Sequence, residues 1–251
     1  MFELFPEMND KPDSQAVGGS LAYILAMFLI LPFFLTVFGV LLFPTEEAQV
    51  WLEVVFHLVS FGLCVVVFRE YLADCFLTLK RNVGRFVLVT ILGTVACCGV
   101  WLCFCLFVPY EPYGVYGVFY SLPVSEKNLL LYPLDVLWNN PIPGLLSMTL
   151  LTPVAVSCLY YGAGFAPICY DRPWLAYVLT TGLIALPRLA NCLMFRWDVE
   201  MELAILAVQL PIHWICCYCY ERTDSIWCPI IIHAVTNLLG SLAVLGLMVL
   251  L

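Results

Sequence analysis

The chain has 251 residues, of which 63% are apolar and 11% are charged, and its formal net charge is -8. This little charge cannot coat a soluble globule of such length, so the composition excludes a soluble domain and predicts an integral membrane protein. Nucleic-acid binding is also excluded as a function, because the 10 lysines and arginines form no broad basic patch.

Long apolar windows predict an all-α, polytopic bundle of about seven transmembrane helices, since a span needs about 20 mostly apolar residues. Short polar loops separate the windows, whereas barrel strands would alternate in polarity over about ten residues. The windows are 22–44, 51–68, 86–108, 144–168, 174–194, 203–220 and 226–251.

We divide the chain into three regions by composition. Residues 1–21 form an acidic cytoplasmic N-terminus, 22–143 an N-terminal transmembrane region with an interfacial segment, and 144–251 a transmembrane core. Because residues 1–19 hold four acidic side chains against one lysine, the first apolar run is expected to be a retained span rather than a secretory signal.

Basic residues predict the orientation, because cytoplasmic loops of membrane proteins carry an excess of lysine and arginine. The second and third windows are separated by a basic cluster, Arg69, Lys80, Arg81 and Arg85. With seven spans this cluster predicts a multi-pass protein of a bacterial-type cytoplasmic membrane, with the N-terminus inside and membrane lipid around it. The 13 cysteines fall mostly within spans, where a thiol behaves as a small apolar residue.

Two polar residues interrupt the last apolar window. His233 and Asn237 are four residues apart, so on a helix they share one face about 6 Å apart. Polar groups at membrane depth usually face a partner or a wet cavity. We therefore expect a functional site on this face.

Two sequence blocks resemble the CAAX-processing and bacteriocin-processing (CPBP) intramembrane metalloprotease family, also called the Abi or CAAX prenyl protease 2-like family. Residues 221–237 read Glu-Arg-Thr-Asp-Ser-Ile-Trp-Cys-Pro, three isoleucines, His233 and then Asn237. Residues 152–162 resemble the family's Pro-x-x-Glu-Glu-x-x-x-Arg-Gly helix, and 171–176 its Arg-Pro-Trp entry to the next span. The resemblance implies a protease-like core over 144–251 and lipidated or hydrophobic peptides as partners.

The chemical residues of the family are largely replaced. Val156 and Ser157 stand where the family has paired glutamates, Tyr161 where it has arginine, and Arg188 where its Phe-x-x-x-His motif has histidine. His233 and Asn237 remain as the retained catalytic motif. Peptide hydrolysis needs a base and an oxyanion-stabilising group, and valine cannot accept a proton. The pattern therefore predicts a pseudoprotease that binds hydrophobic or lipidated peptides.

Arg188 allows two interpretations, because a buried arginine must be paired or must reach the interface. It either extends toward the outer interface or lines the former catalytic cavity, where it would bond Asn237, Ser157 or a bound carboxylate.

Zinc is expected only if the site is active, because a catalytic zinc needs three protein ligands and an open position. His233 and His213 are the weak metal candidates. Neighbouring thiols are Cys158, Cys192 and Cys228. No metal-binding spacing joins these groups, and we expect His213, beside Pro211, to bond a freed backbone carbonyl instead.

Two other functions are open. An active intramembrane endopeptidase could use a relocated base from an outer loop, with Glu200, Glu202 or Asp135 as candidates, and a structural membrane subunit could have inherited the fold alone. Glu53 and His57, also four residues apart, are expected to make an interfacial hydrogen bond rather than a catalytic dyad.

Overall fold

The computed structural model describes residues 46–107, 145–195 and 199–250. These residues are helical apart from short turns, and no strand occurs among them. The all-α prediction is therefore confirmed for this part of the chain. The window 22–44 and the whole interfacial segment, residues 109–143, lie outside the described residues.

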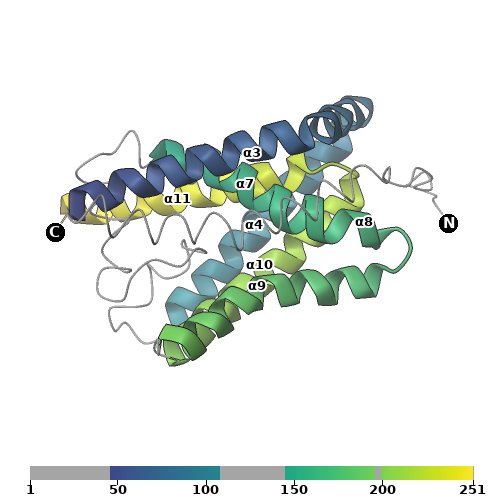
Figure 1. Cartoon of the computed structure of the whole chain (residues 1–251). Coiled ribbons are helices and arrows are strands. Elements are labelled where there is room, and N and C mark those ends of the chain that lie inside the picture. Colours follow the sequence, from purple (N-terminus) through teal and green to yellow (C-terminus); the bar gives the residue numbers. More distant parts are fainter. Residues whose placement is uncertain (1–45, 108–144, 196–198, 251) are drawn as a thin grey trace.

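Five long helices and one composite helix make up the described fold (Figure 1). The long helices are α3 (Glu46–Arg81), α4 (Val83–Phe107), α9 (Pro173–Phe195), α10 (Val199–Thr223) and α11 (Trp227–Leu250). The composite helix consists of π-helix η3 (Ser147–Leu151), α7 (Thr152–Ser157), π-helix η4 (Cys158–Phe165) and α8 (Ala166–Cys169). The predicted windows from residue 51 onward all fall on these elements.

Two of the described helices are long and apolar enough to cross a membrane, Val83–Cys103 and Ser147–Cys169. Shorter apolar stretches occupy Pro173–Leu186 and Trp227–Leu242. The number of spans and the division into three regions stay predictions.

The composite helix occupies the middle of the bundle (Figure 1). Its α7 and η3 segments contact both α3 and α11, and its η4 segment lies against α9. Although α4 follows α3 after a turn at Asn82, it packs mainly on α10 and α11. Residues of the composite helix are thus placed to meet side chains from most of the other helices.

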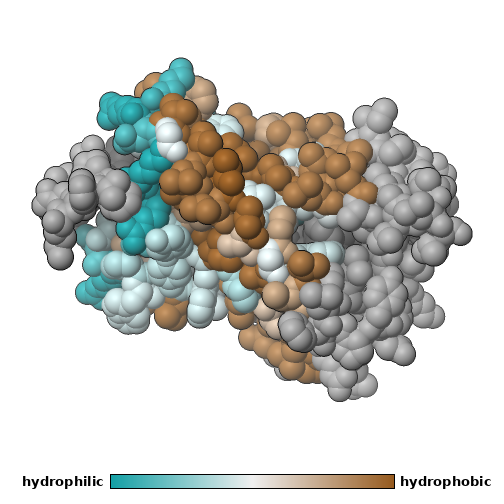
Figure 2. Space-filling model, turned by 180° about the vertical axis from the view of Figure 1, so that it is seen from behind, coloured by the Kyte–Doolittle hydropathy of each residue, from teal (hydrophilic) through white to brown (hydrophobic). Residues whose placement is uncertain are grey.

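Apolar side chains cover much of the outside of the described helices. Val66 and Leu92 are exposed by 72% and 59%, although neither is polar. On the face shown in Figure 2, the most hydrophilic residues gather at one end of the described surface, and hydrophobic residues cover a broad area beside them. This distribution is the one a lipid-facing surface needs, because the hydrocarbon offers no hydrogen bonds.

The turn between α10 and α11 is fastened to the C-terminal part of α3. Ser225 Oγ donates a hydrogen bond of 3.0 Å to the Cys75 carbonyl, and Trp227 Nε1 donates one of 2.9 Å to the Leu72 carbonyl. Asp224, just before them, has a left-handed φ of 50°. Asp is among the few residue types besides glycine that tolerate this conformation, so the chain reverses here without a glycine.

Candidate functional site

The three positions of the first family motif lie in the middle of the composite helix. Val156 and Ser157 end α7, and Tyr161 lies within η4. All three side chains are buried, and Ser157 is fully inaccessible. Ser157 Oγ has no hydrogen-bond partner among the described residues. The region that holds paired glutamates in the family is therefore a packed interior in this chain.

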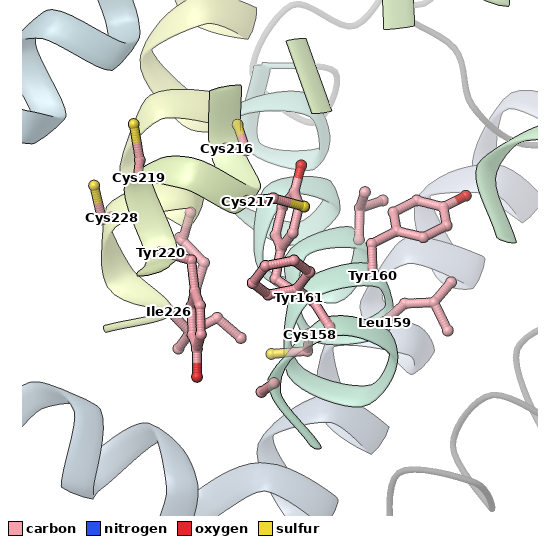
Figure 3. Packing of buried hydrophobic residues seen from close by; sticks show 14 of the residues in the cluster. Cys158, Leu159, Tyr160, Tyr161, Cys216, Cys217, Cys219, Tyr220, Ile226 and Cys228 are labelled. Atoms are coloured by element: carbon pink, nitrogen blue, oxygen red, sulfur yellow. The ribbon is translucent and has the colours of Figure 1, made fainter. Parts of the chain in front are cut away.

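Tyr161 joins this region to α10 through His213. The Tyr161 hydroxyl and His213 Nδ1 share a hydrogen bond of 3.0 Å, and the two rings stack with centroids 4.9 Å apart. On the other side of the imidazole, Nε2 lies 3.5 Å from Cys217 Sγ. Figure 3 shows Tyr161 of η4 beside Cys217 of α10, whereas Tyr160 and Leu159 point away from that helix. Both ring nitrogens of His213 are therefore engaged by side chains.

The expectation that His213 bonds a carbonyl freed by Pro211 is thus wrong. Tyr161 of the composite helix contacts His213 in two ways. Its hydroxyl shares a hydrogen bond with Nδ1, and its ring stacks on the imidazole. Sequence separation hides this contact, because the two residues are 52 positions apart.

The retained pair, His233 and Asn237, lies on α11 as predicted from spacing, but the two side chains have different surroundings. Asn237 Nδ2 donates a hydrogen bond of 2.9 Å to the Met148 carbonyl of η3. His233 is only half-buried by surface area, and it interacts electrostatically with His213. Within the described part of the chain, no hydrogen bond reaches His233. The amide therefore supports the backbone of η3.

The bond from Asn237 compensates for a proline. At the end of η3, the Thr152 amide donates to the Ser147 carbonyl five residues back. In the same register residue 153 would donate to Met148, but Pro153 has no N–H. The Asn237 amide donates to this half-buried carbonyl.

In the described part of the chain, the donor set around His233 does not fit zinc. A catalytic zinc needs three protein ligands from histidine, cysteine or carboxylate. Among the described residues, no three such groups are arranged to hold a metal ion. In His213, the second metal candidate, both ring nitrogens already contact other side chains, those of Tyr161 and Cys217.

Several other predicted residues are placed individually. Cys158 and Cys228 are buried free thiols, and Cys228 Sγ lies 3.2 Å from Thr90 Oγ1. His57 is buried and bonds Ser147 of η3, whereas the hydrogen bond predicted between Glu53 and His57 is not tested. Predictions that lie outside the described residues concern Asp135 and the side chains of Glu53, Arg188, Cys192, Glu200 and Glu202.

Sequence reasoning does not find two residues that the structure brings to these histidines. Cys217 follows His213 by four residues on one helix, so the helical spacing could have indicated it. Ser147 is 90 residues from His57, and no local signal connects the two.

Comparison with known families identifies the C-terminal part of the chain. Residues 138–239 match the family described as Type II CAAX prenyl endopeptidase Rce1-like. No curated protein and no solved structure matches the chain. The matched residues include both blocks on which the resemblance rests, as well as His233 and Asn237. Residues 138–239 are therefore similar to the type II CAAX prenyl endopeptidase Rce1-like family, which is membrane-embedded.

Proposed function

We propose that this protein is a membrane-embedded pseudoprotease that binds hydrophobic or lipidated peptides and does not cleave them. One observation carries the proposal: the position of the family arginine is occupied by Tyr161, whose hydroxyl engages His213 inside a packed interior. The family scaffold is kept around this contact, but the acid and base groups of peptide hydrolysis are replaced.

The replacements remove specific chemical steps. Val156 offers no lone pair to deprotonate water, and Ser157 has no described partner that could activate its hydroxyl. Tyr161 can donate one hydrogen bond, but a neutral phenol bonded to an imidazole is a weaker oxyanion stabiliser than a guanidinium. Ground-state binding of a peptide needs neither step.

The site retains features that a binding protein would use. His233 is half-buried, and its imidazole lies one helical turn from Asn237, whose amide is fixed to Met148. Apolar side chains surround this region, as a prenyl or other lipid group requires. We assign recognition of the peptide to His233 and recognition of the lipid chain to the apolar surroundings.

We further propose seven spans in a bacterial-type cytoplasmic membrane, with the N-terminus inside. In support, basic residues from two connections, Arg85 and Arg222, meet at one end of the bundle. Arg85 interacts electrostatically with Asp224 and Arg222, and Tyr170 contacts the same aspartate. Since positive charge favours the cytoplasmic face, this end is assigned to the cytoplasm.

The test separates binding from cleavage on the purified full chain in lipid nanodiscs. A farnesylated peptide with a photoreactive group measures binding, and the same peptide with a fluorophore and quencher measures turnover. We expect saturable crosslinking that a prenylated competitor suppresses and an unprenylated one does not, without turnover. Turnover that disappears in His233→Ala would contradict the proposal.

A matched pair of variants on α11 tests the assigned role of His233. His233→Ala should weaken crosslinking, because it removes the half-buried imidazole. Leu242→Ala changes a side chain that is 52% exposed on the same helix and should leave crosslinking unchanged. Equal crosslinking by both variants would remove His233 from the binding site.

A structural membrane subunit is the second candidate function. It is favoured by the close packing at the family positions, where Ser157, Tyr161 and His213 are all buried. A subunit of this kind would show no competition by prenylated peptide in the same crosslinking experiment, and it would copurify with a fixed membrane partner.

A further inference from the structure

A second polar site lies away from the family positions, where η3 meets α3. Ser147 Oγ and His57 Nδ1 are 2.7 Å apart, and both side chains are buried. A hydroxyl within hydrogen-bond reach of an imidazole is the pairing that lets serine act as a nucleophile. Neither residue belongs to the motifs that the family resemblance uses.

The backbone that carries Ser147 is held in an unusual conformation. Ser147 begins π-helix η3, and short π-helical turns are frequent at functional sites. The next residue, Met148, is held from α11 on two sides: Asn237 donates to its carbonyl at 2.9 Å, and Ser241 Oγ lies 3.5 Å from its Sδ. These contacts fix the position from which Ser147 faces His57.

A third hydroxyl lies next to the pair. Ser60 follows His57 by three residues on α3 and therefore projects from the same face of the helix. It is fully buried, and its Oγ has no hydrogen-bond partner among the described residues. An unpartnered buried hydroxyl in an apolar interior is costly unless it serves a ligand. It can donate a hydrogen bond to an oxygen that enters beside His57.

We propose that Ser147 and His57 form a serine-hydrolase site for apolar carboxylic esters that enter from the lipid phase. Ser147 is the nucleophile, His57 the general base, and Ser60 a donor to the carbonyl oxygen. Asn237 is a positioning residue that acts through the Met148 carbonyl. The substrate class follows from the surroundings, because exposed side chains of α3 near this site, such as Val55, Leu58 and Val59, are apolar.

The reaction needs no component beyond the ester and water. As Ser147 Oγ bonds to the carbonyl carbon, its proton passes to His57 Nδ1, and the carbonyl oxygen becomes an oxyanion. Collapse of this intermediate breaks the ester C–O bond, and the leaving alcohol takes the proton from His57. Water then attacks the acyl-serine by the same proton route, which releases the carboxylic acid and restores the Ser147 hydroxyl.

Covalent labelling with fluorophosphonates tests the proposal on the purified full chain in nanodiscs. A small dialkyl fluorophosphonate and a long-chain alkyl fluorophosphonate are used, and the modified residue is mapped by mass spectrometry. We expect both probes to label Ser147, with Ser147→Ala unlabelled. His57→Gln should label about 100-fold more slowly, since general-base catalysis contributes about 10²–10⁴ in rate.

Matched variants separate a reactive site from a structural hydrogen bond. Ser225→Ala removes another buried serine, one that donates to a backbone carbonyl, and should label at the wild-type rate. Asn237→Ala should slow labelling because it removes the bond that positions η3, although Ser147 and His57 themselves are unchanged. Thermal melting of every variant identifies any that fails to fold, and conversion of a fluorogenic medium-chain ester provides a second rate.

The outcomes are distinct from those of the pseudoprotease test. Absence of label with both probes on folded wild type, label on another residue, or an unchanged rate in His57→Gln would each overturn the serine site. Ser147→Ala should still crosslink the farnesylated peptide, because Ser147 has no role in peptide binding. If wild type failed to crosslink the peptide but was still labelled at Ser147, only the pseudoprotease proposal would be contradicted.

Discussion

Two buried imidazoles of this protein differ in what surrounds them. His213 stacks on Tyr161, bonds its hydroxyl and reaches Cys217 with the second nitrogen. His57 meets Ser147 at 2.7 Å, and the unpartnered hydroxyl of Ser60 lies one turn away on the same helix. The first arrangement satisfies its polar atoms internally, whereas the second places a basic nitrogen against a primary alcohol.

If both proposals hold, one scaffold has lost one chemistry and supports another. Around Tyr161 the family positions have been filled with groups that pack, so the polar atoms there stabilise the fold. At η3 Asn237 donates to the Met148 carbonyl, so its amide has a structural role that requires no hydrolysis. The same contact holds Ser147 toward His57.

The largest expected effect comes from restoring a family glutamate. Val156→Glu should lower the free energy of unfolding by about 3–5 kcal/mol, because it places an unpaired carboxylate in a packed interior. Val156→Ala removes packing without adding charge and should cost less. Thermal or denaturant unfolding in detergent compares the two variants.

A well-folded Val156→Glu protein with wild-type stability would contradict the contrast drawn between the surroundings of His213 and those of His57. It would mean that the interior near Tyr161 still accommodates a carboxylate and that the ancestral site is open. Peptidase activity gained by the same variant would point in the same direction.

Removing the Tyr161 hydroxyl tests whether it satisfies His213. Tyr161→Phe keeps the stacked ring but leaves the buried Nδ1 without its partner, so we expect a loss of about 1–3 kcal/mol in unfolding free energy. Tyr218→Phe removes a hydroxyl from a residue that is 50% exposed on α10 and should change stability by less than about 0.5 kcal/mol. Similar melting temperatures for both variants would show that the Tyr161–His213 bond contributes little.

The amide of Asn237 provides a smaller test at the second region. Asn237→Ala leaves the Met148 carbonyl without this donor and should cost about 1–2 kcal/mol of unfolding free energy. Ser241→Ala removes only the 3.5 Å contact to the Met148 sulfur and should cost less, since sulfur is a weak acceptor. An effect of Ser241→Ala as large as that of Asn237→Ala would mean that α11 packing, and not the carbonyl bond, holds η3.

The helices of the described part could be predicted from the sequence, because long apolar runs bounded by polar turns leave few alternatives. Windows such as 86–108 and 174–194 coincide with α4 and α9 to within a few residues. The family match to residues 138–239 likewise depends on short sequence motifs that occur in order along the chain. Both signals are local, so one sequence is enough to show them.

The contacts of the candidate site could not be predicted in the same way. Tyr161 lies within π-helix η4 and meets His213 of α10, which is 52 positions away in the sequence. The sequence does not predict a π-helix here, although it does show Pro153 and the replaced motif. The Ser147–His57 pair also depends on tertiary packing between segments 90 residues apart.

The smallest expected effect concerns Asp224, a polar group at the end of the bundle that water reaches. Burial raises the pKa of its carboxyl from 3.8 to about 6, although the Arg85 guanidinium opposes the shift, and one carboxyl oxygen, Oδ1, has no hydrogen bond to a described residue. Because the folded state holds this proton more tightly than the unfolded state, stability should fall as the pH rises from about 4 to about 6 and level off above that. Asp224→Asn, which keeps the shape, should remove this dependence.

At pH 7.5 the asparagine variant should be more stable than wild type by about 1 kcal/mol, allowing for the screening of a half-exposed carboxyl, and at pH 4 the two should be equal. Asp224→Gly provides the control, because it removes the same charge and suits the left-handed φ of 50°. Melting temperatures in detergent at several pH values measure both variants. If wild type and Asp224→Asn lost stability in parallel between pH 4 and 6, the cost of burial would lie elsewhere in the fold. Parallel loss would mean that another group, not yet identified, titrates in this pH range.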